Sequence, residues 1–225
     1  MNVLKDYEIN ELRIPSGRFY GPCSGQDLSI AFHLFGDNIS HFVFCDLGYA
    51  GRNVSVKEAV PDTWVLISHE FARHKQQSEK KTWYSGNKPF RPFSNIERWR
   101  RPDGTDVVVE LRRDLAEDAL LDQFGPKSIS AFMHINDGSG EGGSDLWFLA
   151  TPNHAEDNNG RCQCLLPEVT RRLAKGAIIV TDGALADSGF RSHAPFEAGG
   201  VRWEPIGMLA NNRLEDRQPT IWNVC

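Results

Sequence analysis

Acidic and amide side chains follow four apolar stretches of the sequence, at the points where buried strands are expected to end. They are Asp46 after HFVFC, Asp114 after VVVELRR, Asn136 with Asp137 after SISAFMHI, and Asp182 after AIIVT. In an open α/β sheet, ligands bind outside the carboxyl ends of the strands. Carboxylates at that edge accept hydrogen bonds from ribose hydroxyls or an adenine amine, or bind a metal ion. Loops after strands are also commonly polar, so each acid alone has a plain structural interpretation.

A glycine-containing loop, GPCSG over residues 21–25, follows the first short apolar run and precedes a segment with an apolar helical face. Its glycines let a ligand approach the backbone, although Pro22 removes one backbone N–H. A glycine loop, a helix and a strand that ends on an acid, in that order, are typical of nucleotide sites. We therefore predict a cofactor site formed by Gly21, Ser24, Gly25, Asp46, Asp114 and Asn136.

The stretch HINDGSGEGGSD, residues 134–145, combines four glycines with three acids. So many glycines in one segment cost folding entropy, which favours a functional loop over a plain surface loop. We expect His134, Asp137 or Glu141 to act as a general base toward an acceptor. An alternative is that the 137–145 loop binds a divalent cation through its oxygens. We predict no metal site at His69 and His74, because they do not have the i, i+4 spacing of a helical zinc site.

The elements that must position these residues alternate along much of the chain. We expect strands over 18–20, 41–48, 63–71, 106–114, 128–137 and 177–183, and helices over 24–36, 115–125 and 165–176, the first capped by Ser24 or Asp27. The tail 201–225 is expected to form two paired strands. Pro102, Asp103 and Gly104 predict the turn of a β-hairpin. We predict a single α/β domain over 1–225, in which 50–104 is an insertion or an elaborated sheet edge.

Composition excludes several classes of function. The 225 residues carry a net charge of −5, and this acidic balance does not favour nucleic acid as a partner. No apolar run approaches the ~18 residues of a membrane span, and the first residues lack the apolar core of a signal peptide. The five cysteines fit no disulfide framework. We therefore expect a cytoplasmic protein with reduced thiols and no membrane association, and the sequence leaves its oligomeric state open.

The segment LLPEVTRRLAKGAIIVTDG resembles the helix and fifth strand of class I S-adenosylmethionine-dependent methyltransferases, where the helix ends in Leu-Lys-Pro-Gly-Gly. FYGPCSGQDL lies where that family has its glycine-rich first motif, in a degenerate form with two glycines and no preceding acid. FVFCD, VVVELRRDLAEDALL and SISAFMHIND resemble its second, third and fourth strands, so the resemblance covers roughly two thirds of the chain. It implies that Asp46 holds the ribose and that Asp114 lies near the adenine.

The resemblance implies a Rossmann-like fold, with a mostly parallel central sheet, helices on both faces, antiparallel C-terminal edge strands and a β-hairpin insertion. It also implies methyl transfer from S-adenosylmethionine to a small-molecule or protein acceptor, by an in-line attack that depends mainly on positioning. Two alternatives remain open. One is a non-catalytic Rossmann-like interaction module whose interface is 50–104, and the other is a different nucleotide-using enzyme with a metal held by the 137–145 loop.

Overall fold

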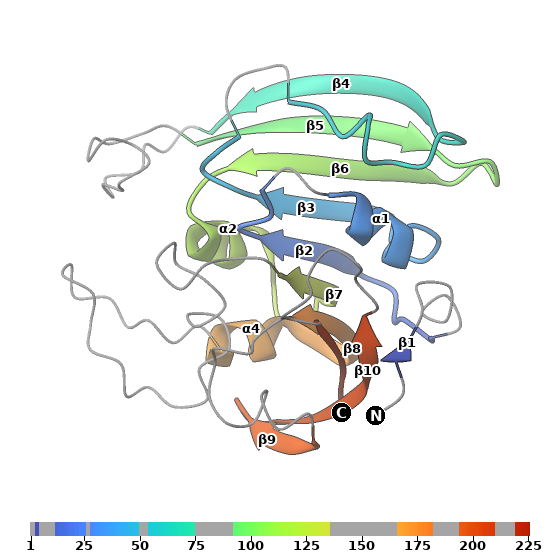
Figure 1. The fold of residues 1–225 in the computed structure, drawn as a ribbon. Helices are drawn as coiled ribbons and strands as arrows, with labels where there is room; N and C mark the ends of the chain where they lie inside the picture. Colours follow the sequence, from blue (N-terminus) through green and yellow to red (C-terminus); the bar gives the residue numbers. More distant parts are fainter. Residues whose placement is uncertain are drawn as a thin grey trace. The chain divides into compact units, whose positions relative to one another are not determined.

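The computed structural model describes residues 3–4, 12–25, 28–49, 54–74, 92–135, 166–181, 194–209 and 219–225. Within these ranges the chain forms eleven strands and three helices (Figure 1). It divides into two compact units, one of residues 18–122 and a second of residues 1–17 with 123–225. No helix in the described ranges is long and apolar enough to cross a membrane.

The 18–122 unit is built on a mixed sheet with the strand order β2-β3-β6-β5-β4. Its elements are β2 (Arg18–Pro22), α1 (Ser29–Phe35), β3 (His41–Cys45), β4 (Val65–Arg73), β5 (Phe93–Arg100), β6 (Asp106–Arg113) and α2 (Ala116–Gln123). Strands β2, β3 and β6 are parallel, whereas β5 is antiparallel to both β6 and β4. The carboxyl ends of β2, β3, β6 and β4 therefore lie at the same edge of this sheet.

The core of this unit on one face of the sheet is a cluster of phenylalanines. Phe19 of β2 lies between Phe42 and Phe44 of β3, with ring centroids 5.3 and 5.1 Å away. Phe32 and Phe35 of α1 pack onto the same rings, and all five side chains are buried. Helix α1 forms because this apolar face is buried, since its N-cap residue makes no side-chain capping bond.

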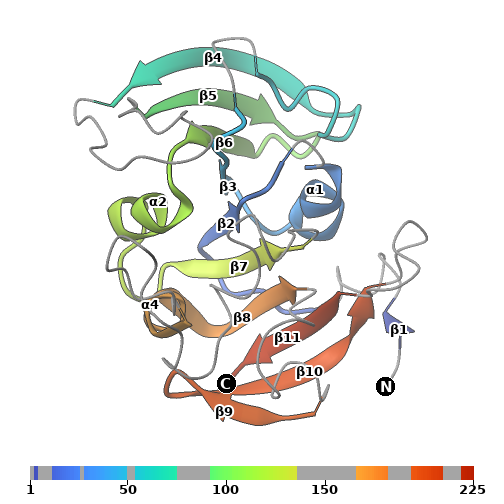
Figure 2. The ribbon, with the colours of Figure 1, turned by 60° about the vertical axis from the view of Figure 1, so that its left-hand side comes forward.

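The second unit has the strand order β1-β10-β11-β8-β7, and β9 pairs with β10. Its elements are β1 (Val3–Leu4), β7 (Ile129–His134), α4 (Leu166–Arg172), β8 (Leu173–Thr181), β9 (Phe196–Ala198), β10 (Val201–Leu209) and β11 (Thr220–Val224). Figure 2 shows β9, β10 and β11 side by side as an antiparallel group. Trp203 and Trp222 are fully buried, and the ring of Phe196 stacks on the first and meets the second edge-on. These three rings form the core around β10 and β11.

The predicted α/β class, with its Rossmann-like sheet and helices on both faces, is wrong. The protein is mostly β, and its three described helices contain only seven or eight residues each. A helix rises about 1.5 Å per residue, so these helices span roughly 11 Å and cannot cover strands of eight or nine residues. Antiparallel pairing is also far more extensive than predicted, because it includes β4 with β5, β5 with β6, β8 with β11, and β10 with both β9 and β11.

Several predicted boundaries also change. The first strand continues to Pro22, so Gly21 belongs to β2 and the loop after it is shorter than predicted. The helix cap expected at Ser24 or Asp27 is wrong, because the N-cap residue of α1 is Leu28. The helix predicted over 165–176 stops at Arg172, and its last residues begin β8 with Gly176 at a φ of +77°. The hairpin turn at residues 102–104 and the paired strands of the tail are confirmed.

Candidate functional site

Two loops meet around Asp46 at the carboxyl edge of the 18–122 unit. Its Oδ2 accepts a hydrogen bond from the backbone N–H of Gly25 at 2.8 Å, in the loop after β2. Its Oδ1 accepts one from the N–H of Gly48 at 2.6 Å, in its own loop. The backbone of Asp46 is tied to the end of strand β6, since Asp46 N–H donates to Arg112 O at 3.0 Å. Asp46 is half-buried, and its carboxylate keeps lone pairs for further donors.

The loop after β2 has an uncommon backbone. Cys23 has a φ of 49° and Gly25 a φ of 56°. The left-handed region costs a residue with a side chain about 1–2 kcal/mol, so neighbouring contacts must hold Cys23 there. The next residue makes two such contacts: Ser24 N–H donates to Cys45 O at 3.3 Å, and Ser24 Oγ lies 2.7 Å from the hydroxyl of Tyr49. Burial raises the pKa of Tyr49, so this hydroxyl stays neutral.

Asp114 follows β6 and belongs to a buried ion pair. Its Oδ2 accepts hydrogen bonds from Nε and Nη2 of Arg112 at 2.9 and 2.7 Å, and its Oδ1 accepts one from Leu115 N–H at 2.8 Å. The side chains of Arg112 and Asp114 are 4% and 3% exposed. Burial raises the pKa of Asp114, and the hydrogen bonds from Arg112 oppose this shift. Asp114 therefore fixes the end of β6, next to Cys45, whose thiol donates to Asp114 O at 3.3 Å.

Gly21 is placed inside β2 rather than in the loop. A Cβ at this position would lie 3.0 Å from the ring of Phe19 and 3.1 Å from the ring of Phe44. Glycine is required here by the packing of the phenylalanine core. The side of Gly21 that a side chain would occupy is filled by protein.

The predicted cofactor residues Gly21, Ser24, Gly25, Asp46 and Asp114 are therefore all in the 18–122 unit, and the last four lie beyond the carboxyl ends of parallel strands. The predicted base His134 is in the second unit, as the last residue of β7, where its side chain is 1% exposed. The remaining predicted residues lie outside the described ranges; they are Asn136, Asp137 and Glu141, together with Asp182 and the 137–145 loop. Their roles remain predictions.

Sequence reasoning missed three polar residues that the 18–122 unit brings together. His74 Nε2 lies 2.8 Å from Ser94 Oγ, and Ser94 Oγ donates to Glu110 Oε1 at 2.5 Å. They come from the end of β4, from β5 and from β6, so only the strand register joins them. Arg112 was missed too, although an Arg and an Asp two residues apart at a strand end are expected on one face.

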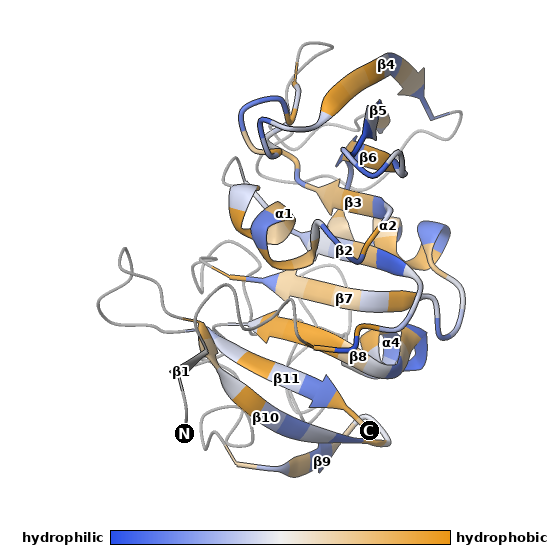
Figure 3. Cartoon of the chain, turned by 90° about the vertical axis from the view of Figure 1, so that its right-hand side faces the viewer, coloured by the Kyte–Doolittle hydropathy of each residue, from blue (hydrophilic) through white to orange (hydrophobic). Residues whose placement is uncertain are grey.

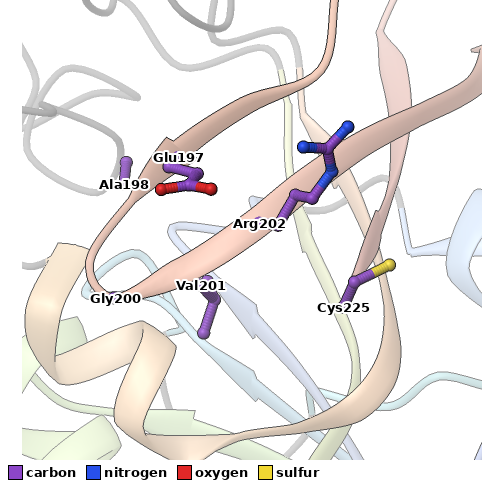
Figure 4. A pocket seen from close by; sticks show the side chains of 6 residues that line it. All are labelled: Glu197, Ala198, Gly200, Val201, Arg202 and Cys225. Atoms are coloured by element: carbon purple, nitrogen blue, oxygen red, sulfur yellow. The ribbon is translucent and has the colours of Figure 1, made fainter.

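The described residues of the second unit line a pocket of about 350 Å³ beside the turn from β9 to β10 (Figure 4). Glu197, Arg202 and Cys225 supply its polar lining. Arg202 is already paired with Glu204, its Nε lying 2.7 Å from Oε1. Nothing in this pocket belongs to the predicted site. Across the described ranges, no three His, Cys, Asp or Glu side chains are grouped so as to hold a metal ion.

No protein-family model matches the chain, and no curated protein matches its sequence significantly. The resemblance to class I methyltransferases is corrected accordingly, because the mostly-β architecture contradicts the fold that it implies. Function must therefore be argued from the site, as fold alone does not specify it.

Proposed function

We propose that the carboxyl edge of the 18–122 unit binds S-adenosylmethionine and that the protein transfers its methyl group to a small-molecule or protein acceptor. The observation that carries the proposal is the half-buried Asp46 carboxylate, held at the end of a central parallel strand by two backbone N–H groups. A carboxylate fixed in this way accepts hydrogen bonds from vicinal ribose hydroxyls without reorganising.

The donor set of the edge fits the nucleoside half of this ligand. Asp46 retains acceptor capacity, and Ser24 adds a hydroxyl in the same loop as the left-handed Cys23. S-Adenosylmethionine, when bound, supplies an electrophilic methyl group. The protein then has to hold the ligand and orient the acceptor. Fixed hydrogen-bonding groups can do both, and methyl transfer needs no covalent intermediate on the chain. His134, Asp137 and Glu141 remain the predicted bases.

Calorimetric titration with S-adenosylmethionine and S-adenosylhomocysteine tests this proposal. We expect micromolar binding by the wild type and a Kd about 10–100-fold higher for Asp46→Ala, which loses a charge-assisted hydrogen bond to the ribose. Tyr49→Phe is the matched control, because it removes another hydrogen bond of the same loop, the one to Ser24, and leaves the carboxylate in place. Its Kd should stay within about twofold of the wild-type value. Absence of binding by the folded wild type refutes the proposal.

A second candidate, an interaction module, is favoured by the edge strand β4. Val65, Leu66 and Ile67 are 61%, 43% and 47% exposed, and Figure 3 shows their apolar character along the first part of this strand. An edge strand offers unpaired backbone groups to a strand of a partner protein. If this is the function, the wild type should bind no S-adenosylmethionine, and Leu66→Lys should abolish retention of the partner protein in affinity purification. Equal retention by both forms counts against it.

A further inference from the structure

Two cysteines lie next to each other at the carboxyl ends of β2 and β3. Pro22, the last residue of β2, is the Cα partner of Cys45, and Ser24 N–H donates to Cys45 O at 3.3 Å. Cys23 lies between Pro22 and Ser24 in the chain. With about 4.8 Å between strands and about 3.3 Å per residue along them, its Cα is roughly 6 Å from that of Cys45. This separation is within the range of about 4.4–6.8 Å that disulfides span.

The side chains of the two cysteines are also close to each other. In a regular strand Cys23 would point to the opposite face from Pro22 and Cys45, but its φ of 49° ends that alternation. Burial raises the pKa of Cys45, and the charge of Cys23 adds to this effect more than that of Asp46, the next residue in the chain. Because Coulomb energy falls with distance, the two sulfurs are near neighbours. Burial likewise raises the pKa of Tyr49, and both thiols add to that shift.

The two thiols differ in their surroundings. Both are in the reduced form, but Cys23 is partly exposed, whereas Cys45 is fully buried. The thiol of Cys45 donates to Asp114 O at 3.3 Å. A dissolved peroxide can therefore reach Cys23 but not Cys45. An accessible cysteine beside a second thiol is the arrangement found in proteins that are oxidised reversibly.

We propose that Cys23 and Cys45 form a reversible disulfide when the protein meets hydrogen peroxide. The sulfur of Cys23 attacks one peroxide oxygen, the O–O bond breaks, and a sulfenic acid and one water are formed. The sulfur of Cys45 then attacks the sulfur of Cys23, and the hydroxide that leaves takes the proton of Cys45 to become a second water. The two thiols thus lose two electrons to one peroxide, and a dithiol reductant reverses the reaction. This inference goes beyond the proposed function and does not depend on it.

The disulfide would join the two loops that meet at Asp46. Cys45 directly precedes Asp46, and Cys23 is two residues before Gly25, whose N–H donates to the Asp46 carboxylate. The bond connects groups that are already neighbours in the reduced chain, so it requires little movement of the strand ends. It also closes a loop of about 22 residues in the unfolded chain, which should stabilise the folded form.

Peptide mapping by mass spectrometry tests the proposal on protein treated with hydrogen peroxide and then alkylated. We expect a cross-link between the peptides of Cys23 and Cys45 that dithiothreitol removes. Cys23→Ser should lose this cross-link. Cys225→Ser is the matched control, because Cys225 is an exposed thiol of the second unit, and it should keep the cross-link. In Cys45→Ala the sulfenic acid at Cys23 has no second thiol to react with, so dimedone should label Cys23.

Absence of the cross-link in the oxidised wild type refutes the proposal, as does a cross-link that joins Cys23 mainly to another cysteine. A second measurement tests the geometry. The oxidised wild type should melt about 5 °C or more above equally treated Cys23→Ser. An equal or lower melting temperature would show that the bond forms only by distorting the strand ends. The wild-type mapping needs no variant, so the test remains decisive even if a variant does not fold.

Discussion

Replacing Arg112 by methionine should destabilise the protein strongly at neutral pH. Asp114 is 3% exposed and would lose two of its three hydrogen-bond donors, keeping only Leu115 N–H. Removing one partner of a buried ion pair typically costs about 3–5 kcal/mol, because the other charge stays buried without compensation. Native domains have only about 5–15 kcal/mol of stability, so this loss is a large fraction of the total. Methionine preserves the aliphatic stem and limits the effect to the charge.

The destabilisation should also depend on pH, with a definite sign. Burial already raises the pKa of Asp114, and loss of Arg112 removes the main opposing contribution, so the folded-state pKa rises further. A carboxyl with a raised folded-state pKa binds its proton more tightly in the folded than in the unfolded chain. The deficit of the variant is therefore complete above the raised folded-state pKa. It shrinks as the pH falls through that value toward the unfolded value near 4.

Urea unfolding, followed by tryptophan fluorescence at pH 7.5 and pH 4.5, measures both effects. Arg100→Met is the matched control, because the Arg100–Asp106 pair has side chains 50% and 58% exposed, and solvent screens an exposed pair so that its loss should hardly change stability. Two results would refute the reasoning. One is a stability of Arg112→Met within 1 kcal/mol of the wild type at pH 7.5, and the other is a deficit equal at both pH values.

Three further predictions concern stability and use the same unfolding measurement. Burial, together with neighbouring arginines, lowers the pKa of His41 to about 4. Between pH 6.5 and pH 4 the wild type should therefore lose about 1–2 kcal/mol of stability relative to His41→Gln, after allowance for partial exposure of the ring. Parallel pH profiles of the two proteins would contradict this. Gly21→Val should destabilise the protein by about 1–3 kcal/mol, since its side chain meets two phenylalanine rings. An unchanged urea midpoint of unfolding would show that the core rearranges to accommodate the side chain. Gly199→Ala should cost more than Gly200→Ala, because both have positive φ but only the first places its Cβ 2.7 Å from the Thr170 side chain; equal costs would rule out that clash.

Local rules predicted the elements whose geometry is fixed by a few neighbouring residues. The turn at 102–104 is an example, because Asp103 Oδ1 accepts Thr105 N–H at 2.8 Å and Gly104 takes a φ of +87°. The residues after Arg172 show the limit of such rules. Their composition suits a helix that ends at Gly176, but pairing of Leu173 with Ile129 extends β8 instead. Long-range pairing overrides local propensity there, and the sequence contains no marker of it.

The candidate site also contains one residue that local rules predict and others that they do not. Asp46 was predictable, because a polar residue after a continuous apolar run marks a strand end. The set of His74, Ser94 and Glu110 was not, because it depends on the register of three strands that are distant in sequence. A shift of one residue in β5 would turn Ser94 to the other face and break both hydrogen bonds.

Burial decides how the polar groups of this edge divide their roles. Asp114 is fully engaged by Arg112 and Leu115, so a ligand that competed for its carboxylate would have to overcome the 3–5 kcal/mol that breaking a buried pair costs. Asp46 is half-buried and retains acceptor capacity, so a ligand meets no such penalty there. The buried pair thus holds the end of β6 rigid between β3 and β5. Asp46 is the group through which we expect a nucleoside to be recognised.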